Sequence, residues 1–232
     1  MTDIDAYIKF QDYMQFQHCR PDYNEAIEQS IRLAKTYAKV KNLVIGDFCC
    51  GTGSNTKELA DLTGSIQKAI LIDINKGFLE IAKKSDIKTK ELILHHSDIL
   101  NVKFKKECDI VFSIFAYHHI PDDRKKDYIF QIKSCLKKGS FLILGEIYFN
   151  NKEQCLNYYD KLYKSIPKKK QISGLKKFLQ QTAKSDDFEF KVSKKFADTQ
   201  FREYGFKLIN EIKIWPKNSN SELGTFVQVY QL

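Results

Sequence analysis

The residues with the clearest chemical pattern lie in the stretch 44–56, which reads VIGDFCCGTGSNT. Two glycines in its turn, Gly51 and Gly53, let the backbone adopt positive φ angles and let a ligand approach without meeting a Cβ atom. Ser54 and Asn55 could cap the helix that we expect next, and its first N–H groups would favour negative charge. These features indicate a site for a nucleotide-like ligand.

A carboxylate further along the chain completes this pattern. A second apolar run, 69–72, ends in Asp73, which lies twenty residues after Gly53. An acid at that distance, at the end of a strand, can accept hydrogen bonds from both hydroxyl groups of a ribose. The dinucleotide pattern G-x-G-x-x-G is absent because Cys49 stands where its first glycine is expected, and no lysine follows the turn as in a P-loop.

Alternating strands and helices must position these residues. Apolar runs predict the strands, and helical spacing of apolar residues predicts the helices. The expected strands are 43–48, 69–74, 91–95, 110–115, 141–147, 206–215 and 225–232, and the expected helices of the core are 55–63, 76–84 and 123–136. Before the core we expect two helical pieces broken at Arg20–Pro21, because the residue before proline is pushed out of the α region. This alternation favours a parallel sheet that binds ligands beyond the carboxyl ends of its strands.

The chain resembles the class I S-adenosylmethionine-dependent methyltransferases, in particular the small-molecule branch that includes ubiquinone and menaquinone methyltransferases. The matching segments, in the family's order, are DFCCGTG, LIDIN, HSDI, DIVFSIFAYHHIPD and LKKGSFLILGE. The resemblance implies an α/β, Rossmann-like fold with a seven-stranded, mostly parallel sheet, an antiparallel last strand and helices on both faces. It also implies S-adenosyl-L-methionine as cofactor and S-adenosyl-L-homocysteine as product.

The same resemblance assigns residues to the cofactor. The turn would hold the methionine end, Asp73 the ribose and Asp47 the amino group through water, while Ile74 and the loop after the third strand would meet the adenine. The full set is Asp47, Cys49, Cys50, Gly51, Gly53, Asp73, Ile74, Ser97, Asp98, Ile99, Ile114 and Phe115, of which the last two would line the sulfonium. Each acid has an ordinary alternative: Asp47 could cap the turn, Asp73 could cap the next helix and Asp98 could begin a turn. Cys50 is interpreted as a packed side chain, not a reactive thiol.

Two histidines, His118 and His119, follow the fourth expected strand, beside the expected methyl acceptor. An imidazole titrates near neutral pH, so one of them could be the general base that takes a proton from a hydroxyl or amine acceptor. The alternative is that the pair closes a helix cap or faces solvent. The acceptor pocket is expected to include Tyr13, Arg20, Tyr23 and Tyr117. The aromatic N-terminal arm either packs its rings on the core or forms a lid over cofactor and substrate.

The acceptor is expected to be a small organic molecule. The family's nucleic-acid amino-methylating enzymes carry an Asn/Asp-Pro-Pro-aromatic run after strand four, and this chain reads SIFAYHH there. Against this, the segment 151–197 holds twelve lysines and five acids and could follow a phosphate backbone, although charge runs are usually solvated surfaces. Methylation of RNA or another nucleic acid and a non-catalytic S-adenosylmethionine-binding regulator remain the alternatives.

A length of 232 residues with 43% hydrophobic residues is enough for one large domain. We expect a single methyltransferase domain, 1–232, with an N-terminal helical lid at 1–40, a cofactor-binding core at 43–147, a Lys-rich helical insertion or cap at 151–200 and a C-terminal helix end with a strand pair at 201–232. Because the chain has no apolar run of about 18 residues and no signal-peptide pattern, we expect a cytoplasmic protein without membrane contact. The sequence does not determine the oligomeric state.

The chain's six cysteines form no C-x-x-C pair, so reduced and mostly packed thiols are expected. The histidines include two adjacent pairs, His95–His96 and His118–His119. Adjacent residues are expected not to point at one ion, so the sequence predicts no metal site.

Overall fold

The computed structural model describes residues 9–64, 66–185, 189–217 and 221–232. Its centre is a seven-stranded sheet with the order β3-β2-β1-β4-β5-β7-β6. The strands are β1 (Val44–Phe48), β2 (Ile66–Asp73), β3 (Thr89–His96), β4 (Cys108–Ile114), β5 (Leu136–Tyr148), β6 (Lys207–Trp215) and β7 (Gly224–Gln231). Strands β1 to β5 pair in parallel, and β7 runs antiparallel to both β5 and β6. The expected mostly parallel sheet with an antiparallel last strand is confirmed.

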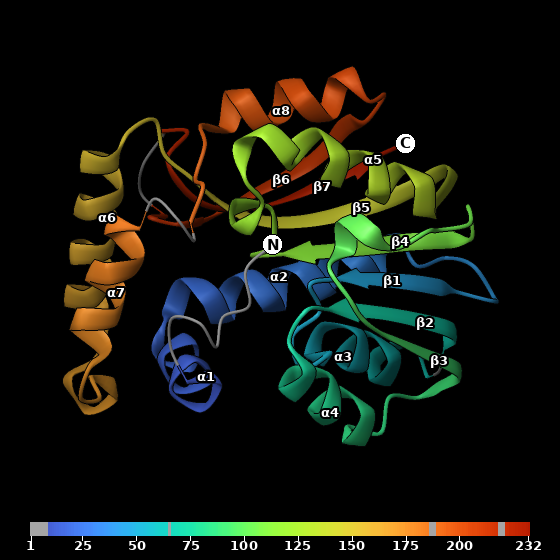
Figure 1. The fold of residues 1–232 in the computed structure, drawn as a ribbon, viewed down its shortest axis with the longest axis horizontal. Coiled ribbons are helices and arrows are strands. Elements are labelled where there is room, and N and C mark those ends of the chain that lie inside the picture. Colours follow the sequence, from blue (N-terminus) through green and yellow to red (C-terminus); the bar gives the residue numbers. More distant parts are fainter. Residues whose placement is uncertain (1–8, 65, 186–188, 218–220) are drawn as a thin grey trace.

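Helices cover both faces of this sheet. They are α1 (Phe10–Cys19), α2 (Pro21–Tyr37), α3 (Ser54–Thr63), α4 (Lys76–Lys84), α5 (Lys125–Cys135), α6 (Lys152–Ser165), α7 (Leu175–Lys184) and α8 (Lys194–Glu203). Figure 1 shows α5 and α8 on one side of the sheet and α2, α3 and α4 on the other. Each side has its own hydrophobic cluster, with Tyr128 and Phe201 in the first and Ile31 and Leu59 in the second.

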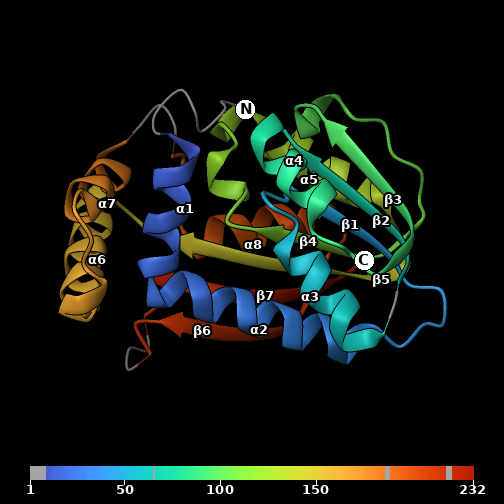
Figure 2. The ribbon, with the colours of Figure 1, turned by 90° about the horizontal axis from the view of Figure 1, so that it is seen from below.

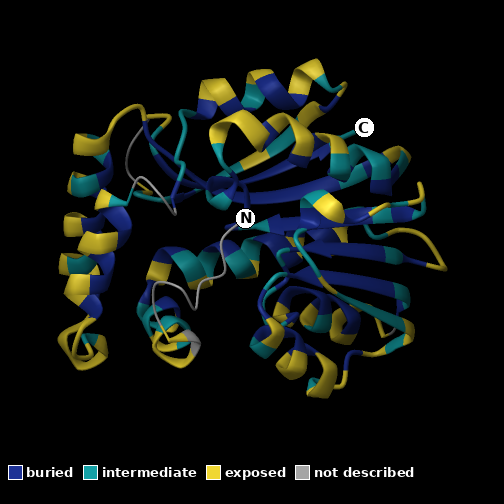
Figure 3. Ribbon diagram, in the orientation of Figure 1, coloured by how far each residue is buried: buried dark blue, intermediate teal, exposed yellow. Residues whose placement is uncertain are grey.

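This double cover explains why the central strands are apolar along their whole length. In β1, Phe48 belongs to the cluster with α5 and Ile45 to the cluster with α2, and both are fully buried. In Figure 3 the central strands are mostly dark blue, while the outer faces of the helices are largely yellow. Phe48 pairs with Ile72, and Asp73 pairs with His96, so β1, β2 and β3 end at the same edge of the sheet.

A third cluster lies beyond the carboxyl ends of the parallel strands. It joins α6 and α7 to the end of β5, with Tyr158, Leu162 and Leu179 among its buried members. Figure 2 shows α1 between the α6–α7 pair and the rest of the molecule. Phe16 of α1 stacks on Phe178 of α7, with ring centroids 5.0 Å apart. We call α1, α6 and α7 the roof, because they lie over this edge of the sheet.

Most element boundaries agree with the sequence-based expectation to within three residues, and the break at Arg20–Pro21 is confirmed by the separate helices α1 and α2. The exception is β5, which begins at Leu136 because this residue pairs with Cys108. Parts of the expected lid (residues 1–8), the expected cap (186–188) and the expected loop before the last strand (218–220) lie outside the described residues.

The expected helix caps are wrong. Helix α3 begins at Ser54, and its N-cap is Gly53 in the left-handed conformation, which offers no side chain for capping. The Asp47 carboxylate takes part of this role, because it accepts hydrogen bonds from both the backbone N–H and the hydroxyl of Thr56 in the first turn. Among the described helices, none has the length and apolar character needed to cross a bilayer.

Candidate active site

The turn after β1 adopts the geometry of a glycine-rich loop although one of its residues is cysteine. Cys49, Gly51 and Gly53 have φ angles of 57°, 53° and 71°. A Cβ atom on Gly53 would lie 2.7 Å from Leu71 Cδ2, so this position requires glycine. A Cβ atom on Gly51 would meet nothing within 4 Å, which leaves open space beside the turn. The substitution at Cys49 therefore preserves the shape of the turn.

The acid at the end of β2 reaches this turn directly. Gly51 N–H donates to Asp73 Oδ2 at 2.8 Å, and Asn75 N–H donates to Asp73 Oδ1 at 2.8 Å. Helix α4 is capped by Asn75, whose Oδ1 accepts from Phe78 N–H at 3.0 Å. The helix-cap alternative for Asp73 is therefore wrong, and its carboxylate lies against the turn.

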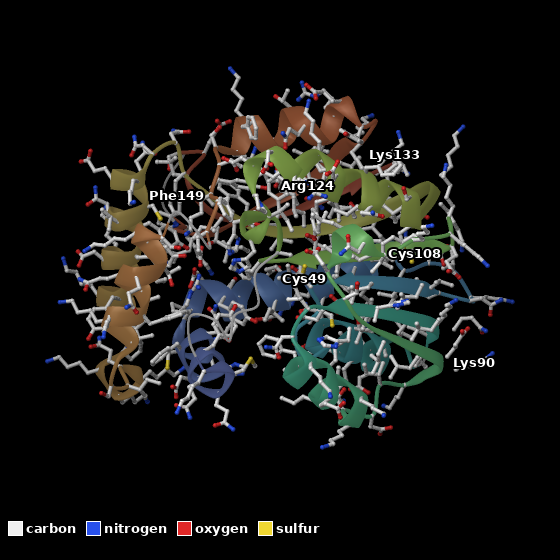
Figure 4. All side chains as sticks on the ribbon, in the orientation of Figure 1. Cys49, Lys90, Cys108, Arg124, Lys133 and Phe149 are labelled. Atoms are coloured by element: carbon white, nitrogen blue, oxygen red, sulfur yellow. The ribbon has the colours of Figure 1, made fainter. Side chains whose placement is uncertain are left out.

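The turn and the acid line one cavity, which we call the main cavity. It measures about 810 Å³ up to its open mouth. Its walls are Tyr13, Met14, Tyr23, Cys49, Cys50, Gly51, Thr52, Ser54, Asn55, Asp73, Ile74, Asn75, Phe78, Ile114, Phe115 and His119. In Figure 4, Cys49 lies toward the roof, whereas Lys90 and Cys108 lie at the opposite end of the sheet. Ten of the residues expected at the site from the sequence meet in this cavity.

Five expected cofactor residues do not line the main cavity: Asp47, Gly53, Ser97, Asp98 and Ile99. Ile99 is a core residue, 1% exposed. Asp98 is the N-cap of a short 3-10 helix, where its Oδ1 accepts from Leu100 N–H at 2.9 Å. The geometry therefore matches the alternative reading of Asp98, in which it begins a turn.

Asp47 lies beneath the turn and is only 1% exposed. Its carboxylate accepts a hydrogen bond from Thr56 Oγ1 at 2.7 Å. Burial raises the pKa of Asp47 from its ordinary value of 3.8, the Thr56 hydrogen bonds oppose this rise, and the Asp73 charge adds to it, giving a pKa of about 7. Among the described residues no cationic side chain pairs with Asp47. The electrostatics beneath the turn therefore favour a cationic ligand group.

A second, smaller space adjoins the main cavity, and we call it the side cavity. It measures about 250 Å³ and is lined by Tyr13, Gln17, Arg20, Phe115, His118, His119, Ile147, Tyr159 and Glu189. Tyr13, Phe115 and His119 line both cavities. The side cavity is rich in polar and ionisable side chains, and a polar void of this kind can hold an ordered water or a polar ligand group.

The two histidines lie at the junction of the cavities, on a 3-10 turn (Tyr117–His119) after β4. His118 Nδ1 contacts Glu146 Oε1, and His118 N–H donates to Glu146 Oε2 at 3.1 Å. Burial alone would raise the pKa of Glu146, but His118 and backbone N–H groups hold it below its usual range. Beneath the 3-10 turn that carries the two histidines, buried Lys125 Nζ donates to Tyr117 O at 3.0 Å and to Ile120 O at 2.7 Å. The buried residues Glu146 and Lys125 thus hold the histidine turn in position.

Glu189 faces the histidines from the segment after α7. Its Oε2 lies 3.6 Å from His118 Nε2 and 2.5 Å from Lys191 Nζ. Burial would raise the pKa of Glu189, but Lys191, His118 and His119 hold it at about 2. Ring nitrogens of both histidines and a carboxylate oxygen of Glu189 all lie within 4.8 Å of one another. The expectation that adjacent histidines cannot face one point is therefore wrong for this pair.

Three of the expected substrate residues line a cavity, and the fourth lies in the hydrophobic core. Tyr13 and Tyr23 line the main cavity, and Tyr23 stacks on Phe115 with centroids 5.2 Å apart. Arg20 lines the side cavity, where Asp22 holds its guanidinium at 2.7 Å. Tyr117 is fully buried in the core and donates from its hydroxyl to Gln200 Oε1 at 2.6 Å, so its assignment to the acceptor pocket is corrected.

Several residues of the two cavities were not anticipated. Asn55 and Asn75 in the main cavity belong to turns whose side-chain directions depend on the exact helix start. Glu146 ends a recognised motif, LILGE, but nothing in the sequence connects it with His118. Glu189 lies in the Lys-rich segment, and no local pattern marks it.

With this geometry established, similarity to known proteins can be assessed. Residues 45–139 match a family model described as a methyltransferase domain, and the sheet order and cavity position agree with that match. Over these residues the chain is similar to a methyltransferase domain. The match begins in β1 and ends in β5, so the domain supplies the turn, Asp73 and the histidine turn together.

The matches between this chain and its curated relatives cover only part of each relative's length. A protein from Anoxybacillus flavithermus named as an uncharacterized methyltransferase is 24% identical over 132 residues, which are 56% of this chain and 59% of the relative. A demethylmenaquinone methyltransferase from Oceanobacillus iheyensis is 33% identical over 79 residues, 33% of each chain. The chain therefore spans about half, or less, of the length of these curated relatives.

A solved structure supports the fold over nearly the whole chain. Magnesium protoporphyrin IX methyltransferase (ChlM) from Synechocystis, crystallised with bound S-adenosylhomocysteine, superposes with a TM-score of 0.64 at 13% identity. The superposition covers 90% of this chain and 83% of that one. The superposed part is therefore larger than the segment 45–139 that matches the family model.

Proposed function

We propose that the protein transfers a methyl group from S-adenosyl-L-methionine to a small organic acceptor. The observation that carries this proposal is the meeting of the turn and the β2 acid in one cavity, with Gly51 N–H bonded to Asp73 Oδ2 at 2.8 Å. An adenosyl amino acid needs both a ribose acceptor and a close backbone approach for its amino-acid end. The methyltransferase family and relatives such as ChlM with S-adenosylhomocysteine support this choice of ligand.

The polar groups of the main cavity fit this cofactor. The N-terminus of α3 begins at Ser54 in the wall of this cavity, and its positive end favours the methionine carboxylate. Buried Asn55 Oδ1 accepts no hydrogen bond among the described residues, and Asp47 lacks a cationic partner, so both suit the methionine ammonium group. Ile74 and Phe78 give an apolar surface for the adenine, and Phe115 borders the sulfonium where the main and side cavities meet.

The side cavity is the proposed acceptor site. The bound cofactor supplies an electrophilic methyl group, and the chain's own residues must align the acceptor in line with it and exclude water. The roof closes this space: Tyr13 and Tyr159 form part of the wall, and Tyr13 contacts Phe178 with ring centroids 6.1 Å apart. Only about 10 Å³ of this space can hold the centre of a water-sized molecule, which is room for about one water, so an acceptor group requires movement of the roof. The two imidazoles and the Glu189 carboxylate line this space, where the acceptor's proton must leave.

Calorimetric titration of the purified chain with S-adenosyl-L-homocysteine tests the proposal. We expect binding with one site, and Asp73→Ala should weaken it by about tenfold to a hundredfold, because two ribose hydroxyls and the Gly51 N–H lose their acceptor. Asp61→Ala is the matched control, since Asp61 lies on the outer part of α3 and pairs with Lys57 and Lys88. Absence of binding in the folded wild-type protein, or equal affinity in Asp73→Ala, contradicts the proposed site.

A further inference from the structure

We propose that His118, His119 and Glu189 bind a divalent first-row transition-metal ion at the junction of the two cavities. Two imidazoles and one carboxylate form a common ligand set for such ions, and they can occupy one side of the ion while its other positions stay open. Here the three donors come from two segments, the turn after β4 and the strand-like segment after α7, and they converge on the polar side cavity. Because Glu189 is far from the two histidines in the sequence, no local motif reveals this arrangement.

The first support is the way His118 is held. Its Nδ1 faces Glu146 Oε1, and Glu146 is fixed in turn by the N–H groups of His118 and Ile147 at 3.1 and 2.7 Å. A metal-bound histidine commonly donates its other ring N–H to a carboxylate, which fixes the tautomer and makes the ligating nitrogen more basic. With Nδ1–H donated to Glu146, the lone pair of His118 lies on Nε2, the atom that faces Glu189.

The second support is the contact between Nε2 and Glu189. In a neutral His118 that carries its proton on Nδ1, Nε2 and Glu189 Oε2 both have lone pairs, and these two atoms lie 3.6 Å apart, which is too long for a hydrogen bond. Ligand atoms bound to one zinc ion lie roughly 3 to 3.6 Å apart, given bond lengths of about 2.0 to 2.2 Å. Glu189 is 8% exposed, and its Oε2 accepts no hydrogen bond of good geometry in the described structure. A cation between the two atoms would satisfy both.

Among the described residues, one amine contacts Glu189. With both imidazoles neutral, Lys191 contacts Glu189, Lys125 acts on Glu146, and Arg20 is already paired with Asp22. Lys191 Nζ also donates to Thr182 O at 3.0 Å, so it can remain hydrogen-bonded without Glu189. In the metal-free protein Lys191 competes for the carboxylate that the ion would use.

This inference rests on the proposed function for its role in catalysis. An ion held on one side by the three residues has open positions toward the side cavity, where the hydroxyl oxygen of an acceptor could bind. A bound cation lowers the pKa of such a hydroxyl, so its proton passes to water. The oxygen then forms a bond to the methyl carbon, the carbon–sulfur bond breaks, and the electron pair stays on sulfur as a neutral thioether. The acceptor class is therefore a hydroxyl compound.

Metal titration of the full chain tests the site. The protein, first treated with EDTA and dialysed, is titrated with Co²⁺ followed by visible absorption and with Zn²⁺ followed by calorimetry. We expect one equivalent of each ion to bind, and Glu189→Gln and His119→Asn each to weaken binding by at least about tenfold. His18→Asn is the matched control, because His18 is exposed at the end of α1 and its loss should leave the affinity unchanged.

A fourth variant separates a metal site from a cluster held together only by hydrogen bonds and charge. Lys191→Gln should tighten metal binding, because it removes the amine that lies 2.5 Å from Glu189 Oε2. S-adenosyl-L-homocysteine binding is measured on the same samples. Retained binding of that ligand with no metal binding, or with metal binding that Glu189→Gln and His119→Asn leave unchanged, overturns the metal site alone. Metal binding without binding of that ligand overturns the proposed function and leaves the metal site standing.

Discussion

Replacing Asp47 by asparagine should stabilise the free protein while weakening cofactor binding. The carboxylate is 1% exposed, has Thr56 Oγ1 as donor at 2.7 Å, and feels the charge of Asp73. Asparagine is nearly the same size, and its Oδ1 can accept the same hydrogen bond from Thr56. The substitution therefore removes the charge and one of the two oxygens that can accept from the Thr56 hydroxyl and backbone N–H.

The magnitude follows from the pKa of Asp47, which is about 7 in the folded protein and ordinarily 3.8. Between these values the unfolded chain has already lost the proton that the folded chain retains, so the free energy of unfolding falls as the pH rises from about 4 to 7. The total loss is about 4 kcal/mol at pH 8. The Asp47→Asn variant has no carboxyl group to ionise at this position, so its free energy of unfolding does not fall in this way. The variant should match the wild type near pH 4 and exceed it in stability by up to about 4 kcal/mol at pH 8.

Urea denaturation at pH 5 and pH 8, without ligand, measures this difference. Asp123→Asn removes an exposed carboxylate and serves as the control for general charge effects. At pH 8 the variant should also bind S-adenosyl-L-homocysteine at least about tenfold more weakly, because the ligand's ammonium group loses a buried counter-charge. A stability gap between Asp47→Asn and the wild type that is equal at the two pH values would refute the reasoning.

Three further substitutions have clear structural expectations. Gly53→Ala should lower the free energy of unfolding, measured by urea denaturation, by about 2 to 3 kcal/mol, because the added Cβ atom would clash with Leu71 and the backbone there is left-handed. Gly51→Ala should lower it by only about 1 kcal/mol, because the added Cβ atom meets no neighbour and only the positive φ angle opposes it. Lys125→Met should destabilise the protein by about 2 to 3 kcal/mol by leaving two buried carbonyl groups of the histidine turn without donors, and a cost below 1 kcal/mol would contradict this.

The parts of the fold that follow from periodicity were accessible from the sequence. The apolar runs ending at Phe48 and Asp73 are strands because both sides of the sheet are covered, and the helix 76–84 was located to the residue. Ser54 and Asn55 were wrongly predicted as caps of α3. The left-handed Gly53 is the N-cap, so Ser54 already lies within the helix. Propensity alone does not distinguish a cap from a first helical residue.

The parts of the site that depend on distant segments were not accessible. The turn and Asp73 were found together because parallel pairing brings consecutive strand ends to one edge. Tyr117 was misplaced because Phe115, with a φ angle of 54°, redirects the chain after β4 and turns the tyrosine into the core. Glu189 meets His118 because the neighbouring Phe190 N–H donates to His118 O at 2.6 Å, a contact between distant segments that no local pattern encodes.

The separation of the roof from the sheet has a consequence for divergence. The histidine turn is anchored by Lys125 and Glu146, which belong to the core, whereas the wall above the acceptor is built from a self-contained cluster that includes Tyr159 and Phe178. Changes in that wall can reshape the space for a substrate while the imidazoles and the ribose-binding acid keep their places. Related chains can therefore acquire new acceptors by exchanging this outer part and inheriting the chemistry beneath it.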